Sequence, residues 1–218
     1  MDWNQIVVKY GFGEVRENYH HTPQDAHINK PERHEWFHCS KEPGGSEFEV
    51  CNFLNSFVKL IKPQNVLETG AEQGHGTVAL AEAVQYNGLG HVTTVDNCRI
   101  AKTKVPVILE ECSLSDKVTY CDMNSVEFAD TYEGPPFDFV FFDCGFPSRI
   151  QCFDRLQERG KLSRFVSFHD VSHYQRVNDP QTEDYCAELD RIAKQHASEY
   201  GGIFNVLSRG FRLFQLAL

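Results

Sequence analysis

The chain has 218 residues, a formal net charge of −10 and 41% hydrophobic residues, which is typical of one water-soluble domain of ordinary size. No apolar run approaches the roughly 20 residues that cross a bilayer, and the N-terminus has neither the basic nor the apolar region of a secretory signal, so we expect a cytoplasmic protein with no membrane partner. The excess of negative charge repels phosphate backbones, so nucleic acid is not expected as a partner either.

The first 46 residues are expected to form a cap on the domain and not a domain of their own. They contain five of the ten histidines, several prolines and the run Pro43-Gly44-Gly45, but few aliphatic residues. A segment of this length and composition cannot bury a hydrophobic core by itself. We therefore divide the chain into a cap or lid at residues 1–46 and a domain at residues 47–218.

Within the cap, residues 34–38 have the sequence HEWFH, which matches the HExxH signature of zinc metalloproteases. On a helix, His34 and His38 would lie on one face and could share a zinc ion. However, Pro31 precedes the motif and Pro43 follows it closely, so any helix there is short. We interpret the segment as a lid, with an incidental metal site and a zinc peptidase as the alternatives.

Beyond the cap, short strands alternate with longer amphipathic helices. Apolar residues near helical spacing predict a first helix at 47–61. Further helices are predicted at 77–86, 100–111, 125–132, 150–159 and 181–200, with Pro106 disturbing the helix at 100–111. Strands are predicted at 65–69, 91–96, 117–121, 137–143 and 164–169, followed by a hairpin of two strands at 203–207 and 211–216.

This order of elements predicts an α/β fold of five β-α units and a terminal hairpin. The alternation favours a doubly wound, Rossmann-like parallel sheet with right-handed crossovers. The strand at 137–143 is almost wholly apolar, which places it in the middle of the sheet with both faces covered. The hairpin brings the sheet to seven strands, one of which must be antiparallel to its partner.

A glycine-rich turn between the first strand and the following helix is the main functional motif. Glycines occupy positions 70, 74 and 76 of the segment Glu68–Thr77, and glycine lets the backbone approach a ligand closely. The helix N-terminus beyond the turn favours a negative group such as a carboxylate. The dinucleotide fingerprint requires glycine where this chain has Glu72, whose carboxylate would face a pyrophosphate, so a nicotinamide-dependent oxidoreductase is disfavoured.

Acidic residues follow the next strands at their carboxyl ends, where ligands of open α/β sheets bind. Asp96 can accept hydrogen bonds from both hydroxyls of a ribose, and Asp122 is placed to lie beside an adenine or, alternatively, to cap a helix. Asp143, His169 and Asp170 should converge on one point, where His169 suits a general base near neutral pH. Alternatively, His169 and Asp170 only pair with each other or cap a loop.

Residues 47–218 resemble the class I S-adenosylmethionine-dependent methyltransferases, and most closely the small O-methyltransferases related to the catechol type and to methyltransferase family 24. The segment LETGAEQGHGTVALAEAV resembles their first motif, while VDN, CDMN, FFDCG and FHD fall in the places of the next four. The resemblance implies the sheet order 3-2-1-4-5-7-6 with strand seven antiparallel, and S-adenosylmethionine as the bound methyl donor. We expect the donor site to comprise Glu68, Gly70, Glu72, Gln73, Gly74, Thr77, Asp96, Asn97, Asp122, Met123 and Asp143.

The resemblance also raises the question of a metal ion. Catechol-type enzymes bind Mg²⁺ through an Asp after strand four and an Asp-Asn pair after strand five. Asp143 and Asp170 match two of these ligands, but Val171 stands where Asn is expected, and Phe146 stands where those enzymes carry a catalytic Lys. A divalent cation, Mg²⁺ or Mn²⁺, at Asp143 and Asp170 with His169 or His173 as a substitute ligand therefore stays open.

The function expected from these features is methyl transfer to a small-molecule acceptor, with a hydroxyl as the favoured nucleophile. Catalysis is assigned to His169, Asp143 and Asp170, where either the histidine or a bound metal would activate the acceptor. Alternatives are N- or C-methylation on the same scaffold and a non-catalytic protein that binds S-adenosylmethionine; a homodimer is a further expectation. The walls of the acceptor pocket are predicted to include Tyr19, Trp36, Phe146 and Tyr174.

Overall fold

The computed structural model describes residues 1–12, 15–16, 38–39, 45–171, 180–198 and 210–217. Its main feature is a six-stranded sheet in the order β5-β4-β3-β6-β7-β8, in which only β8 is antiparallel to its neighbour. The predicted sheet order is confirmed for these strands, while the expected strand at 203–207 lies outside the described residues. The strands are β3 (Asn65–Thr69), β4 (His91–Val95), β5 (Val118–Cys121), β6 (Phe137–Phe142), β7 (Leu162–His169) and β8 (Phe211–Gln215).

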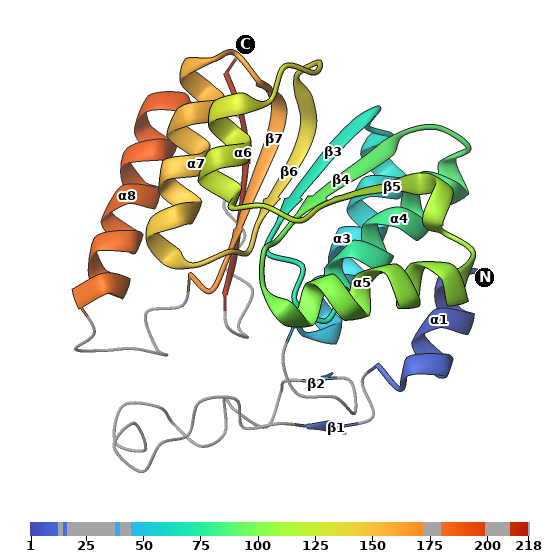
Figure 1. Cartoon of the computed structure of the whole chain (residues 1–218). Coiled ribbons are helices and arrows are strands. Elements are labelled where there is room, and N and C mark those ends of the chain that lie inside the picture. Colours follow the sequence, from blue (N-terminus) through green and yellow to red (C-terminus); the bar gives the residue numbers. More distant parts are fainter. Residues whose placement is uncertain (13–14, 17–37, 40–44, 172–179, 199–209, 218) are drawn as a thin grey trace.

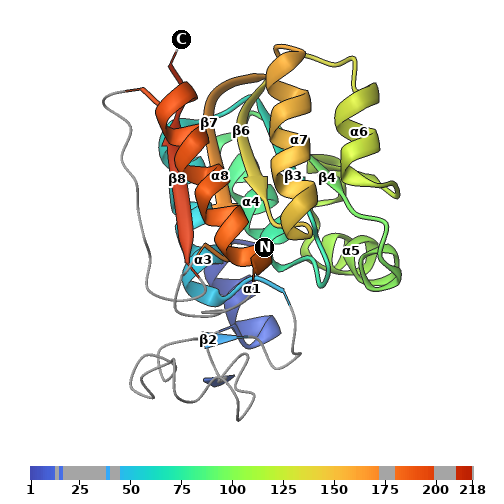
Figure 2. The same cartoon turned by 90° about the vertical axis from the view of Figure 1, so that its left-hand side faces the viewer.

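Helices cover both faces of this sheet, as predicted for a doubly wound fold (Figures 1 and 2). One face carries α3, α4 and α5, and the other carries α6, α7 and α8. Among the described helices, none is long and apolar enough to cross a membrane. Their bounds are α3 (Phe48–Ile61), α4 (His75–Asn87), α5 (Arg99–Cys112), α6 (Ser125–Thr131), α7 (Phe146–Glu158) and α8 (Pro180–His196), with a 3₁₀ turn at Ser115–Lys117.

The central strands β3 and β6 divide their side chains between two hydrophobic cores. Val66 and Phe139 belong to the core under α3, α4 and α5, whereas Leu67 and Val140 belong to the core under α6, α7 and α8. Successive side chains of a strand point to opposite faces, so a strand that is apolar throughout feeds both cores. The predicted central position of β6 is therefore confirmed.

The helix α5 runs through Pro106 without interruption, contrary to the expectation that this proline would disturb it. Pro106 is exposed, and so is Lys102, whose carbonyl loses its hydrogen-bond partner because proline has no N–H. Water can satisfy such a carbonyl, so the cost of the proline is lower there than in a buried turn. The core-facing residues Val105, Ile108 and Leu109 keep helical spacing.

The N-terminal segment contains one helix that the sequence analysis did not predict, α1 (Trp3–Tyr10). Asp2 and Gln5 form a capping box at its start, and Trp3 and Ile6 are buried in the core that α3 and α4 share. Between α1 and α3 the structure describes two short antiparallel strands, β1 (Val15–Arg16) and β2 (His38–Cys39). The division of the chain after residue 46 stays a prediction.

His38 lies in a strand, so the HExxH segment does not end in the helix that a zinc peptidase site requires. The rest of that motif, residues 34–37, lies outside the described residues.

Candidate functional site

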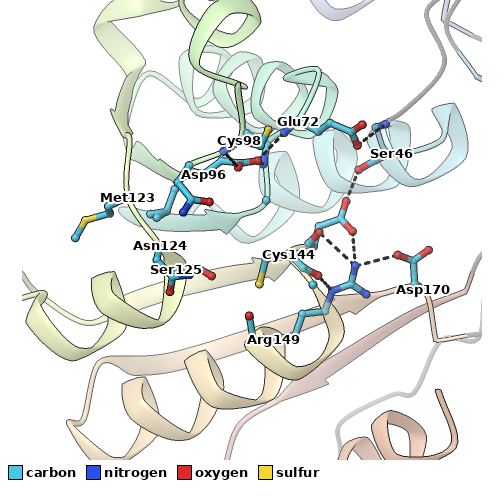
Figure 3. A pocket seen from close by; sticks show the side chains of 18 residues that line it. Ser46, Glu72, Asp96, Cys98, Met123, Asn124, Ser125, Cys144, Arg149 and Asp170 are labelled. Atoms are coloured by element: carbon cyan, nitrogen blue, oxygen red, sulfur yellow. Dashed lines mark hydrogen bonds and ion pairs between the residues drawn. The ribbon is translucent and has the colours of Figure 1, made fainter. Parts of the chain in front are cut away.

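A cavity of about 330 Å³ opens at the carboxyl edge of the sheet (Figure 3). Its walls come from the segments that follow five successive parallel strands, β3 to β7, and from residues 45–46 before α3. This is the edge at which open α/β sheets bind ligands. The predicted site residues in its lining are Gly70, Glu72, Asp96, Asn97, Met123, Asp143 and Asp170.

The turn after β3 approaches the end of β6 so closely that only glycine fits at position 70. A Cβ atom there would lie 2.6 Å from backbone atoms of Asp143 and Cys144, and the φ angle of +87° is one that other residues rarely adopt. The Gly70 N–H donates to the carbonyl of Val95, 2.9 Å away, which also fixes the turn to β4. The backbone at Gly70 thus lies close to the end of β6 and also lines the cavity.

Asp96 holds the glycine-rich turn in shape from the end of β4. Its Oδ2 accepts the backbone N–H groups of Ala71 and Glu72 at 2.8 and 2.9 Å, and its Oδ1 accepts that of Cys98 at 2.7 Å. A carboxylate offers about four acceptor positions, so Oδ1 can still accept one further hydrogen bond. Asp96 is therefore both a support of the turn and an acceptor in the cavity wall.

Glu68 lies beneath the turn and outside the cavity lining. It is 1% exposed and accepts the hydroxyl hydrogens of Thr94, at 2.6 Å, and of Thr77. Burial raises the pKa of Glu68 to about 8, although the two hydroxyl groups act in the opposite direction. We expected Glu68 and Thr77 to contact the donor, but in this arrangement they support the start of α4 from below.

Three more residues predicted for the donor site also lie outside the cavity lining. Asp122 is exposed and forms an ion pair with Lys102 of α5. Gly74 precedes α4 with a positive φ angle, and a Cβ at this position would lie 3.1 Å from Ile108 of α5. Gln73 occupies the same turn. These residues shape or flank the turn without forming the wall of the cavity.

A cluster of buried charges forms the side of the cavity next to β6 and β7. The Arg149 guanidinium, on the first turn of α7, lies between two carboxylates: its Nη2 is 3.0 Å from Asp143 Oδ1 and 2.9 Å from Asp170 Oδ2. Arg149 also donates to the backbone carbonyls of Cys144 and His169. Ser46 donates from the opposite side to Asp143 Oδ2 at 2.8 Å (Figure 3).

His169 does not occupy the position of a general base. Its imidazole is fully buried, with Nδ1 2.8 Å from Asp143 Oδ1 and Nε2 2.7 Å from Glu47 Oε2. Burial alone lowers the pKa of His169, but Asp143, Glu47 and Asp170 outweigh burial and raise it to about 10. An imidazolium enclosed by two carboxylates cannot take a proton from an acceptor near neutral pH, so this expectation is corrected.

Asp143, His169 and Asp170 could in principle form a metal site, because ligand atoms of all three lie within 4.8 Å of one another. The contacts of these atoms do not fit a divalent cation. The guanidinium of Arg149 already lies between the two carboxylates, and both imidazole nitrogens face carboxylates. A metal ion in this space would be repelled by the positive charge of the Arg149 guanidinium.

The sequence analysis missed three residues of this cluster: Ser46, Glu47 and Arg149. Arg149 follows Asp143 by six residues, and the start of α7 at Phe146, four residues earlier than predicted, turns its side chain back toward the strand end. Ser46 and Glu47 meet residues 97 and 122 positions later in the chain. Of the predicted acceptor walls, Tyr19, Trp36 and Tyr174 lie outside the described residues, and Phe146 stacks on Arg149 at 4.9 Å.

Comparison with known proteins agrees with this architecture. A family profile described as a methyltransferase domain matches residues 67–171, while no curated protein sequence matches the chain significantly. A solved structure of an O-methyltransferase from Bacillus cereus in complex with SAH is 22% identical, with a TM-score of 0.65 over 81% of this chain and 84% of that chain.

Two other solved methyltransferase structures are similar to this chain in fold. The O-methyltransferase TomG from Streptomyces achromogenes, in complex with SAM, is 19% identical with a TM-score of 0.65 over 79% of this chain and 81% of that chain. The SAH-bound methyltransferase PaMTH1 of Podospora anserina is 13% identical with a TM-score of 0.67 over 81% of this chain and 83% of that chain. Residues 67–171 therefore match a methyltransferase domain, and the chain has the fold of these solved methyltransferases.

Proposed function

We propose that this protein transfers the methyl group of S-adenosylmethionine to a hydroxyl group of a small molecule. The observation that carries the proposal is the glycine-rich turn after β3, which Asp96 fixes in place and which opens into the cavity at the carboxyl edge of the sheet. Structural neighbours with the same fold include O-methyltransferases crystallised with SAM or SAH, which supports this donor and this acceptor atom.

The charge of the cavity wall suits a cationic donor better than a dinucleotide. Four acidic residues, Glu72, Asp96, Asp143 and Asp170, line the cavity together with one basic residue, Arg149, so acidic side chains outnumber basic ones in the lining. S-adenosylmethionine carries an amine and a sulfonium, which a carboxylate-rich wall attracts, whereas the pyrophosphate of a dinucleotide would be repelled. The expectation that Glu72 disfavours a nicotinamide cofactor is consistent with its place in the wall.

Most of the rate enhancement would come from holding the acceptor oxygen in line with the methyl group and its leaving sulfur. The acceptor oxygen forms the new bond to carbon, the bonding pair of the old bond stays on sulfur, and the hydroxyl proton passes to a carboxylate of the cavity wall and then to solvent. Asp143 and Asp170 are the predicted catalytic residues that line the cavity, and a carboxylate there can accept a hydrogen bond from the acceptor hydroxyl.

Titration calorimetry of the purified protein tests the donor site. We expect SAM and SAH to bind in the micromolar range and NAD⁺ not to bind, because the carboxylate wall would repel the pyrophosphate that only NAD⁺ carries. Absence of binding by both sulfur ligands, in protein shown to be folded by circular dichroism, would refute the proposal. SAH release with small phenols, alcohols and amines then separates O-methylation from N-methylation and from binding without turnover.

The variant Asp96→Asn tests whether Asp96 is the main determinant of the donor site. An amide cannot accept hydrogen bonds from three backbone N–H groups and from a ligand at once, so the turn should loosen. We expect SAH affinity to fall by roughly 10-fold to 100-fold, equivalent to about 1.4 to 2.8 kcal/mol. Asp122→Asn is the matched control, because Asp122 lies outside the cavity lining and pairs with Lys102. An equal loss in both variants would contradict the assignment.

A homodimer stays a prediction, and sedimentation equilibrium of the purified protein would decide it. A cytoplasmic location is likewise an expectation from the sequence.

A further inference from the structure

Arg149 is enclosed in the protein interior, only 3% exposed, at the point where the ends of β6 and β7 meet. Its N–H groups donate to oxygen atoms of two segments. From the end of β6 they reach the Asp143 carboxylate and the carbonyls of Asp143 and Cys144; from the end of β7 they reach the Asp170 carboxylate and the His169 carbonyl. The acceptors are thus two carboxylates and three backbone carbonyls.

This set of acceptors is the one that a hard divalent cation prefers. Mg²⁺ and Ca²⁺ take carboxylate and carbonyl oxygens as ligands, often from separate segments that they tie together. A guanidinium is also a permanent cation, with five N–H donors that match oxygen acceptors in a plane. At this position the guanidinium of Arg149 therefore provides the positive charge and the contacts to oxygen atoms that a bound metal ion would otherwise provide.

The environment of Arg149 holds the guanidinium in one orientation. The rings of Phe146 and Tyr185 lie 4.9 and 5.6 Å from its central carbon, and such contacts between a cation and an aromatic face are favourable when both are desolvated. Tyr185, on α8, also donates its hydroxyl to the His169 carbonyl at 3.0 Å. The two rings also contact each other, with centroids 5.0 Å apart. A guanidinium packed against this aromatic pair and hydrogen-bonded to five oxygen atoms does not swing away to admit a metal ion.

We propose that Arg149 takes the place of a divalent cation in this site. The positive charge that holds Asp143 and Asp170 together is that of a residue on α7. The acceptor side of the cavity therefore needs no metal ion. This inference concerns the acceptor side of the proposed methyltransferase, but its test does not depend on methyl transfer. Arg149 is a positioning residue here, because it acts through the two carboxylates that line the cavity.

The test is titration of the full-length protein with Mn²⁺, followed by electron paramagnetic resonance of the free ion. We expect no stoichiometric binding to the unmodified protein at millimolar Mn²⁺. In Arg149→Met the carboxylates lose their cation while the volume and apolar stem are largely kept, so Mn²⁺ affinity should rise at least about 10-fold. Arg155→Met, on the exposed side of the same helix, is the matched control and should bind no more Mn²⁺ than the unmodified protein.

Two results would overturn the inference. The first is Mn²⁺ binding by the unmodified protein that Asp170→Asn abolishes. The second is a folded Arg149→Met that binds Mn²⁺ no better than the unmodified protein. If Arg149→Met does not fold, the titration of the unmodified protein and of Asp170→Asn still decides the question. Titration of the same samples with SAH reports the donor site separately. We expect the affinity for SAH to be the same in EDTA as in Mg²⁺.

Discussion

Replacing Gly70 with alanine is expected to lower the free energy of unfolding by roughly 3 kcal/mol or more. The new Cβ would lie 2.6 Å from backbone atoms of Asp143 and Cys144, and backbone atoms cannot move aside as a flexible side chain can. A positive φ of +87° adds a cost of about 1–2 kcal/mol for a residue with a side chain. Urea denaturation followed by circular dichroism measures the change.

Gly88→Ala is the matched control for this prediction. Gly88 also has a positive φ, +67°, but a Cβ there meets nothing within 4 Å. This variant should therefore show only the conformational cost of about 1–2 kcal/mol. The difference between the two variants isolates the steric conflict between the turn after β3 and the end of β6. Equal losses of stability would mean that these two segments separate easily, and the description of the turn would be wrong.

Replacing Glu68 with glutamine is expected to stabilise the protein at alkaline pH by roughly 3–5 kcal/mol and to leave it nearly unchanged at pH 5. Burial raises the pKa of Glu68 from 4.5 to about 8, so the folded protein keeps this proton over a range in which the unfolded chain has lost it. When the folded state binds more protons, stability falls as pH rises. The fall lies between about pH 4.5 and pH 8, and glutamine removes it because its amide does not ionise.

The measurement is the free energy of unfolding of both proteins at intervals from pH 5 to pH 9. His169 also has a raised pKa, about 10, so its contribution is lost as pH rises above its unfolded value of 6.5. That contribution is common to both proteins and cancels in their difference. Glu110→Gln, an exposed change on α5, should stay within about 0.5 kcal/mol of the unmodified protein throughout. A difference for Glu68→Gln that does not change with pH would contradict the prediction.

The order of strands and the place of the site were predictable from the sequence because both follow from local patterns. Alternating strands and helices determine a doubly wound sheet, and in a parallel sheet every strand ends at the same edge. Asp96, Asp143 and Asp170 each follow such a strand, so topology alone places all three at the cavity. No information about side-chain packing was needed for that step.

The partners of these side chains were not predictable in the same way. Asp143 and Asp170 share an ion pair with Arg149, and His169 meets Glu47 from a segment far away in the sequence. Such pairs depend on how helices pack on the sheet, which residue spacing does not specify. The direction of Glu68 follows from the twofold alternation of β3, which turns it away from the cavity and under α4, where Thr77 and Thr94 accommodate it.

The antiparallel strand β8 has a consequence for folding during synthesis. It is made after the other described strands, yet it pairs with residues 165–169 of β7 and supplies Phe211 and Leu213 to one core and Phe214 to the other. At about 5–20 residues per second, the ribosome needs about 2–8 s to proceed from the end of β7 to the start of β8. Throughout that interval one edge of β7 lacks its final partner, and an open strand edge is a template for pairing with other chains. The hazard of aggregation is therefore greatest between the synthesis of β7 and that of β8, before β8 pairs with the open edge of β7.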